Sequence, residues 1–383
     1  ERMQEREEEE EEIEDPNDEE DLGRIFAKRI RWPVRNLRYG GWLAQEVVRD
    51  LLRVFQELLS NSFFPVLQPA IRVGSTFEGW SPSESDTVYR MFVPLKPPRG
   101  HVFHLELDPV GEMPLKDSCI RVELECTCTG ERLVEDMLCF LHHPKEELRR
   151  NQAPSLLSTL CTGSYLDVEK TVCWFQKFVR PAWMLGSYVH HYNMRVLPSS
   201  NTCKLQLTNN FWKIIFIEII FGVQQGNSDI FLCSQTTETI STPSTTWPQS
   251  HIVAEAKFFS YVAREAPRDS FHLKCLQLCT HILEGTSFSA YALKTIVMHL
   301  LTSIPLSDWR RRDFLLRLLD IMQYLRQCVE EKCLNHFFFG NENVPQEVIL
   351  PPNFQTAKSH NLFKDLVQDP AAHAEALREF TEL

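Results

Sequence analysis

The first half of the chain mixes helical and strand-like spacings of apolar residues. Apolar residues recur every three or four positions over residues 42–60 and again over 166–178, which predicts two amphipathic helices. Residues 101–108 and 120–127 alternate between apolar and polar, as half-buried antiparallel strands do. Shorter apolar runs predict further strands at 89–94, 204–208 and 230–233.

The second half is helical in pattern. Residues 235–250 are rich in Ser, Thr and Pro and predict a loop or domain boundary. Helical spacing follows at 252–264, 270–284, 288–302 and 307–335. Asp369 before Pro370 is typical of the start of a last short helix. We therefore expect an α+β protein, with a mixed or antiparallel sheet and flanking helices followed by an all-helical C-terminal domain.

One apolar run, residues 213–223, predicts a central strand buried on both faces. It contains Lys213 and Glu218 and is too short to span a bilayer, which takes about 20 apolar residues. Glu218 lies in its middle. A buried carboxylate needs a metal ion, a basic partner or a solvent-filled cleft. An exposed position or an ion pair with an arginine would account for it equally well.

The net negative charge of the chain comes from its first 21 residues. Residues 1–21 hold 14 acidic residues and two arginines, and so account for the whole net charge of −12. We expect this segment to be an acidic disordered linker. A basic patch follows at residues 24–38, which could bind anionic lipid or nucleic acid, or neutralise the acidic run. The electrically neutral remainder gives no reason to expect specific nucleic-acid binding.

The 12 cysteines are scattered and lack the dense framework of small secreted domains. Most, for example Cys173, Cys233 and Cys328, fall in apolar patterns. We expect mostly buried thiols in a reducing compartment.

No zinc site is expected, because none of the His and Cys groups has the paired spacing typical of four ligands. Three of these residues share one helical face and are expected to be core groups: His272, Cys275 and Cys279. Another set lacks paired spacing: Cys126, Cys128, His142 and His143.

Residues 73–95 carry the strongest candidate chemistry. Gly74 and Ser75 form a turn that could approach a triphosphate with backbone N–H groups. Glu84 and Asp86 come just before a predicted strand, and acids two residues apart point to the same side of a strand. With Glu218 as a third acid, this is the arrangement that holds two magnesium ions for nucleotidyl transfer. An ordinary solvated acidic loop is the competing interpretation.

These motifs resemble the nucleotidyltransferase fold of the cyclic GMP-AMP synthase and male-abnormal-twenty-one superfamily. Within it, the chain is most similar to the inositol trisphosphate receptor-interacting protein-like family. The matching strings are DMLCFLHHP (136–144), LCTGSYLDVEKTVCWFQ (160–176), TCKLQL (202–207), FHLKCLQ (271–277) and HFFFGNENVP (336–345). The resemblance implies a nucleotidyltransferase-like domain over 22–240, a linker at 241–250, a helix-hairpin-helix-like domain over 251–345 and an extension over 346–383.

The chain departs from active members of this superfamily. Ser85 stands where they have a hydrophobic residue, and Glu218 stands where Asp is typical. The resemblance therefore implies a pseudoenzyme: a non-catalytic scaffold with a receptor or channel as partner. It also implies tethering by a single-pass transmembrane helix outside this sequence. The free-looking cysteines favour the cytoplasm for the folded domain. The alternative is a Mg²⁺-dependent nucleotidyltransferase that uses ATP or GTP, with Glu84, Asp86 and Glu218 as metal ligands and Gly74 and Ser75 at the nucleotide.

Overall fold

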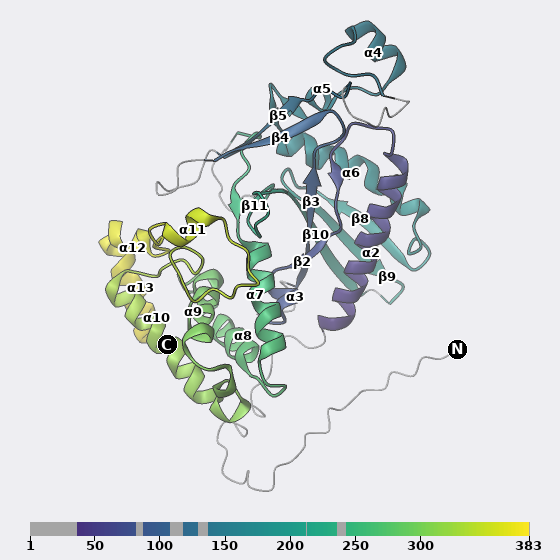
Figure 1. Cartoon of the computed structure of the whole chain (residues 1–383). Helices are drawn as coiled ribbons and strands as arrows, with labels where there is room; N and C mark the ends of the chain where they lie inside the picture. Colours follow the sequence, from purple (N-terminus) through teal and green to yellow (C-terminus); the bar gives the residue numbers. More distant parts are fainter. Residues whose placement is uncertain are drawn as a thin grey trace.

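The structure is a computed structural model that describes residues 37–81, 87–107, 118–128, 137–211, 213–235 and 243–382. Figure 1 shows a sheet with helices beside it, followed along the chain by a separate group of helices. This arrangement confirms the expected α+β class and its helical C-terminal region. The acidic segment 1–21 lies outside the described residues, as does the basic patch except for its last two positions.

The main sheet has eight strands. They are β1 (Val66–Leu67), β2 (Ile71–Val73), β3 (Val88–Lys96), β8 (Tyr192–Leu197), β9 (Cys203–Asn209), β10 (Ile214–Gln224), β11 (Phe231–Cys233) and β12 (Gln249–Ser250). β10 pairs with β3 in parallel and with β9 and β11 antiparallel, so that the sheet is mixed. Most of β10 is buried, which confirms the central strand expected at 213–223.

Two long helices cover this sheet, α2 (Leu37–Leu58) and α6 (Val168–Leu185). The Phe55 ring of α2 stacks on Phe175 of α6 at 4.5 Å between centroids, and Phe175 meets Phe221 of β10 edge-on at 4.9 Å. Both helices are longer than their apolar patterns indicated. α6 continues through Pro181, and α2 begins five residues before position 42.

The early start of α2 depends on two glycines. Gly40 and Gly41 are buried in its first turns, although glycine disfavours helix interiors. A Cβ atom at Gly40 would lie 2.1 Å from the Tyr89 hydroxyl oxygen. Glycine is therefore required for the helix to approach β3 this closely.

A second, four-stranded sheet lies at the upper end of the molecule in Figure 1. Its strands are β4 (His101–Glu106), β5 (Cys119–Leu124), β6 (Cys161–Thr162) and β7 (Tyr165–Leu166). Two short helices connect β5 to β6, namely α4 (Lys145–Asn151) and α5 (Leu156–Thr159). α4 projects furthest from the rest of the molecule.

The helical half has its own apolar core. Its helices are α7 (Ile252–Glu265), α8 (His272–Ile282), α9 (Ala290–Ser303), α10 (Phe314–Glu331), α11 (Pro352–Thr356), α12 (Lys364–Gln368) and α13 (Pro370–Glu382). The Asp369 carboxylate accepts a hydrogen bond from the Ala371 N–H at 2.8 Å and so caps the last helix as expected. Within the described residues, no helix combines the length and the apolar character that a membrane span requires.

Two expectations need correction. The helix expected over 307–335 begins only at Phe314, because the residues before it form short 3₁₀ turns and the Trp309 carbonyl accepts a hydrogen bond from the Phe271 N–H at 2.7 Å. The loop expected over 235–250 is anchored in its described part. There Trp247 is fully buried and its indole N–H donates to the Leu166 carbonyl at 2.8 Å, next to the short strand β12.

Candidate functional site

Glu218 occupies the middle of β10 and is only 5% exposed. It lies opposite Arg90 in the parallel register of β10 with β3, and the Arg90 Nε donates to its Oε2 at 3.0 Å. The Thr202 hydroxyl donates to Oε1, also at 3.0 Å, and the Lys204 Nζ lies 3.8 Å away. The buried carboxylate is thus neutralised by side chains of the protein itself.

The Gly74–Ser75 turn lies on the other side of Arg90. Gly74 follows β2, whose last residue pairs with Arg90, and Ser75 begins the one-turn helix α3 (Ser75–Glu78). Gly74 has a φ of +84°, which non-glycine residues rarely adopt. A Cβ atom there would lie 3.5 Å from the Arg90 Cδ. The structure therefore brings Gly74 and Glu218 together around one arginine, which sequence reasoning did not single out.

The other two acids of the candidate site, Glu84 and Asp86, lie outside the described residues. The strand expected after them is present as β3, which begins two positions beyond Asp86. At Glu218 the described residues do not fit a magnesium ion. Both carboxylate oxygens accept hydrogen bonds, and a metal would have to displace the Arg90 guanidinium.

A buried lysine joins this region to the helical half. The Lys294 Nζ of α9 lies 2.9 Å from a Glu78 oxygen in α3 and 2.5 Å from a Glu255 oxygen in α7. Glu78 also accepts a hydrogen bond from the Trp80 indole at 2.7 Å. Burial lowers the pKa of Lys294, but the two carboxylates outweigh it and hold the pKa above its ordinary value. The lone charge in the apolar run of α9 was the signal for this cluster.

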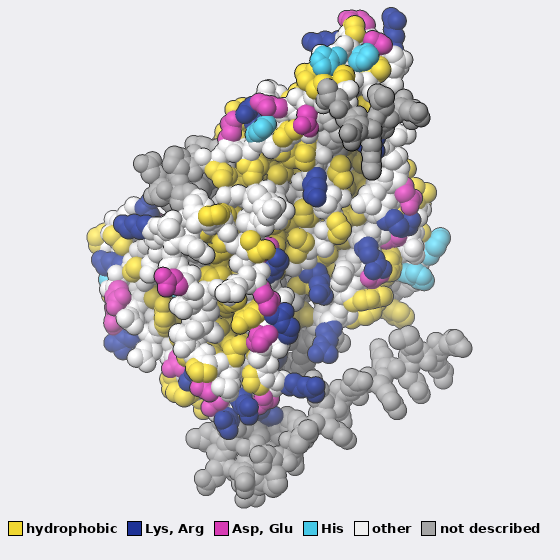
Figure 2. Space-filling view, viewed as in Figure 1, with side chains coloured by type: hydrophobic (Ala, Val, Ile, Leu, Met, Phe, Trp, Pro, Cys, Tyr) yellow, Lys and Arg dark blue, Asp and Glu magenta, His cyan; other side chains and the backbone are white. Residues whose placement is uncertain are grey.

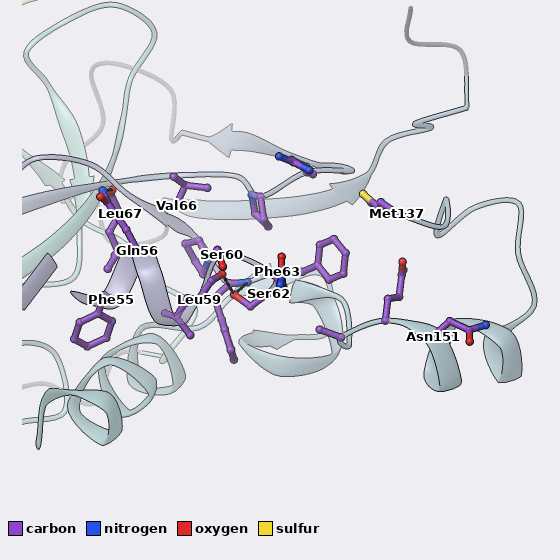
Figure 3. Close-up of a pocket in the computed structure, with 17 residues that line it drawn as sticks. Phe55, Gln56, Leu59, Ser60, Ser62, Phe63, Val66, Leu67, Met137 and Asn151 are labelled. Atoms are coloured by element: carbon purple, nitrogen blue, oxygen red, sulfur yellow. Dashed lines mark hydrogen bonds between the residues drawn. The ribbon is translucent and has the colours of Figure 1, made fainter. Parts of the chain in front are cut away.

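Two cavities lie near this sheet, and neither is lined by Gly74, Ser75 or Glu218. One, of about 650 Å³, lies between β2 and α7. The other, of about 680 Å³, is shown in Figure 3, where Phe55, Gln56 and Leu59 at the end of α2 lie across from Met137 and Asn151. The cavity between β2 and α7 reaches Glu78 of α3, the helix that Ser75 begins, whereas the cavity in Figure 3 is not lined by α3.

The cysteines follow expectation in part. All 12 belong to the described residues, and none of these forms a disulfide. Cys233 and Cys328 are buried as expected, whereas Cys173 is exposed because it points away from the core-facing side of α6. His272, Cys275 and Cys279 are buried core groups, and the His272 Nδ1 hydrogen-bonds to the Ser270 hydroxyl at 2.7 Å.

One cluster of cysteines and a histidine was not predicted from the sequence. The structure gathers Cys126, Cys128 and His142, for which no site was expected, with Cys139. Cys139 belongs to one of the strings that carry the family resemblance and was not considered as a ligand. The overlooked signal was Cys-x-Cys followed by Cys-x-x-His, which supplies a ligand pair from each of two segments.

Comparison with known proteins agrees with this fold. Residues 272–369 match the family described as "Mab-21 protein HhH/H2TH-like domain". The chain is 33% identical over 376 residues to "Inositol 1,4,5-trisphosphate receptor-interacting protein-like 1" of Rattus norvegicus, an alignment that covers 95% of this chain and 68% of that protein. The protein of the same name from Mus musculus matches with the same identity and coverage.

A third relative, "Inositol 1,4,5-trisphosphate receptor-interacting protein" of Danio rerio, is 32% identical over 359 residues, which cover 87% of this chain and 66% of the relative. These alignments run through both halves of the chain, whereas the Mab-21 match is confined to the helical half. The chain therefore belongs to the inositol 1,4,5-trisphosphate receptor-interacting protein-like family, within the Mab-21 superfamily.

Proposed function

We propose that this chain is a non-catalytic interaction domain with a degenerate nucleotidyltransferase cleft. The observation that carries the proposal is the ion pair between Arg90 and Glu218. In a two-metal site the third carboxylate must be free to bind Mg²⁺. Here that carboxylate is engaged by a guanidinium and a hydroxyl, and Gly74 lies against the same arginine.

The partner in this proposal is an inositol 1,4,5-trisphosphate receptor. Its support is the names of the relatives, which describe them as interacting with that receptor or as like such proteins. The test is equilibrium binding of the full chain to purified receptor, with the receptor immobilised. Saturable binding that unlabelled chain competes away is the expected result, and an affinity no better than for an unrelated channel would contradict the partner assignment.

We also propose that the domain is held at a membrane by a single-pass segment outside this sequence and faces the cytoplasm. The cysteines support the cytoplasmic side, because 12 thiols without a disulfide suit a reducing compartment, and the tether is what the family resemblance implies. Two assays on cells that make the natural full-length protein test these parts. Protease digestion tests the side of the membrane, and cell fractionation tests the tether. Digestion of the domain in cells with a permeabilised plasma membrane, but not in intact cells, is expected. Recovery of the full-length protein in the soluble fraction would contradict the tether.

A further inference from the structure

Four potential metal ligands meet where the segment that carries α4 joins the rest of the molecule. We call this projecting segment the lobe, and the place where it joins the molecule its base. The segment after β5 supplies Cys126 and Cys128, and the turn before α4 supplies Cys139 and His142. The His142 Nδ1 lies 3.5, 3.1 and 3.5 Å from the sulfurs of Cys126, Cys128 and Cys139, respectively. All four ligand atoms lie within 4.8 Å of one another.

We propose that these four residues bind one structural zinc ion. Zinc binds thiolate sulfur at about 2.3 Å and imidazole nitrogen at about 2.0–2.1 Å, so that neighbouring ligands of a tetrahedral site lie about 3.5–3.8 Å apart. Two of the three sulfur–nitrogen distances, at 3.5 Å, agree with that spacing, and the third, at 3.1 Å, is shorter by about 0.4 Å. A Cys₃His set fills all four positions and leaves none for a substrate, as is typical of structural zinc.

The neighbouring residues distinguish His142 from the histidine beside it. The His143 Nδ1 lies 3.2 Å from a Glu147 carboxylate oxygen, one turn along α4. The backbone N–H groups of His142 and His143 both donate to the Cys139 carbonyl, which closes a tight turn. That turn directs the Cys139 and His142 side chains toward the same place, whereas the His143 side chain faces Glu147 of α4.

The described residues of the lobe make few other contacts that could hold it in place. None of the residues of α4 is buried, and Figures 1 and 2 show the lobe projecting from the molecule with histidine side chains on its surface. Its base is held by two hydrogen bonds between the Gln152 side chain and the Leu138 backbone, at 3.0 and 3.1 Å, and by the Phe140 ring against Phe63 at 4.7 Å. Small units with so little core are commonly stabilised by a metal ion.

Elemental analysis of the full chain tests the proposal. The protein is purified under reducing conditions without a chelator, and its zinc, iron and copper are measured by mass spectrometry. About one zinc ion per chain is expected. Cys128→Ser and His142→Ala should each lose most of it, and because both side chains are exposed these variants should still fold. The matched controls Cys173→Ser and His143→Ala alter an exposed cysteine on α6 and the adjacent histidine, and they should retain the metal.

Cobalt substitution gives a second readout that does not depend on co-purified metal. Co²⁺ added to the metal-free chain should give the visible absorption of a tetrahedral thiolate site, and zinc should abolish it. The proposal is overturned if the chain neither carries zinc nor takes it up from added zinc sulfate. It is also overturned if iron or copper occupies the site, or if both ligand variants keep full zinc.

Discussion

At the scale of single residues, Arg90 and Glu218 form an ion pair whose two side chains are unequally buried. The Arg90 side chain is 33% exposed, whereas the Glu218 side chain is 7% exposed. Removing the arginine leaves a buried carboxylate whose remaining cation among the described residues is Lys204, at 3.8 Å. Removing the charge of Glu218 leaves an arginine that water can reach. The two halves of the ion pair should therefore differ in their importance for stability.

The first prediction follows from this difference. Arg90→Met should lower the free energy of unfolding by about 1–3 kcal/mol. Glu218→Gln should lower it by less, about 1 kcal/mol, because the amide oxygen can accept only one of the two hydrogen bonds but water can still solvate Arg90. Urea denaturation at pH 7.5 measures both. A larger loss from Glu218→Gln than from Arg90→Met would contradict the assigned pairing.

Buried histidines give a second prediction. The rings of His251 and His336 lie 4.5 Å apart. Burial is the main cause that lowers the pKa of His251 to about 4; Glu255 opposes the shift and His360 adds to it. Burial also holds the pKa of His336 well below its ordinary value. The unfolded chain binds more protons than the folded chain between pH 6.5 and 4. Stability therefore falls as the pH drops through this range, by about 1.5 kcal/mol for His251 alone between pH 6.5 and 5.

His251→Phe is the variant for that test. The His251 ring stacks against Phe338, and its Nε2 has no hydrogen-bond partner among the described residues, so phenylalanine should fit. The difference in urea midpoint between pH 7 and pH 5 should shrink in this variant. The exposed His190→Gln should leave it unchanged. An equal pH dependence in wild type and His251→Phe would be evidence against a buried neutral His251.

At the scale of elements, α3 depends on the contact that Lys294 makes from α9. Lys294→Met would leave the Glu78 and Glu255 carboxylates buried without their cation and should lower the free energy of unfolding by about 3–5 kcal/mol. The exposed Lys358→Met is the control and should cost less than about 0.5 kcal/mol. Thermal unfolding of both variants measures the difference. A Lys294→Met protein as stable as the control would show that the ion cluster does not hold α3 in place.

Element types were predictable from periodicity, but several boundaries were not. β10 was recognised because a continuous apolar run is typical of a strand buried on both faces. The start of α2 was missed because its first turns use Gly40 and Gly41, whose role appears only where Tyr89 lies against them. The start of α10 was placed too early because tertiary hydrogen bonds to residues 309–310 replace the first expected turns.

At the scale of the whole molecule, the candidate site was half predictable. Glu218 could be identified as an unusual buried acid, and its pairing with an arginine was one of the alternatives. Its partner was not predictable, because Arg90 lies 128 residues earlier in the chain and meets Glu218 only through the parallel register. The four clustered Cys and His ligands lie near one another in the sequence, and they were missed because Cys139, which supplies a ligand pair with His142, was not counted as a ligand.

Thermal melting of the full chain shows whether the cleft still binds metal and nucleotide. The chain is melted with millimolar Mg²⁺ or Mn²⁺, with ATP or GTP, and with both together. A ligand that binds the folded state raises the melting temperature by mass action. If the cleft is degenerate, neither nucleotide gives a saturable rise in the melting temperature. A saturable, metal-dependent rise that is lost on Asp86→Ala and on Glu218→Gln would contradict it and would favour a nucleotidyltransferase instead.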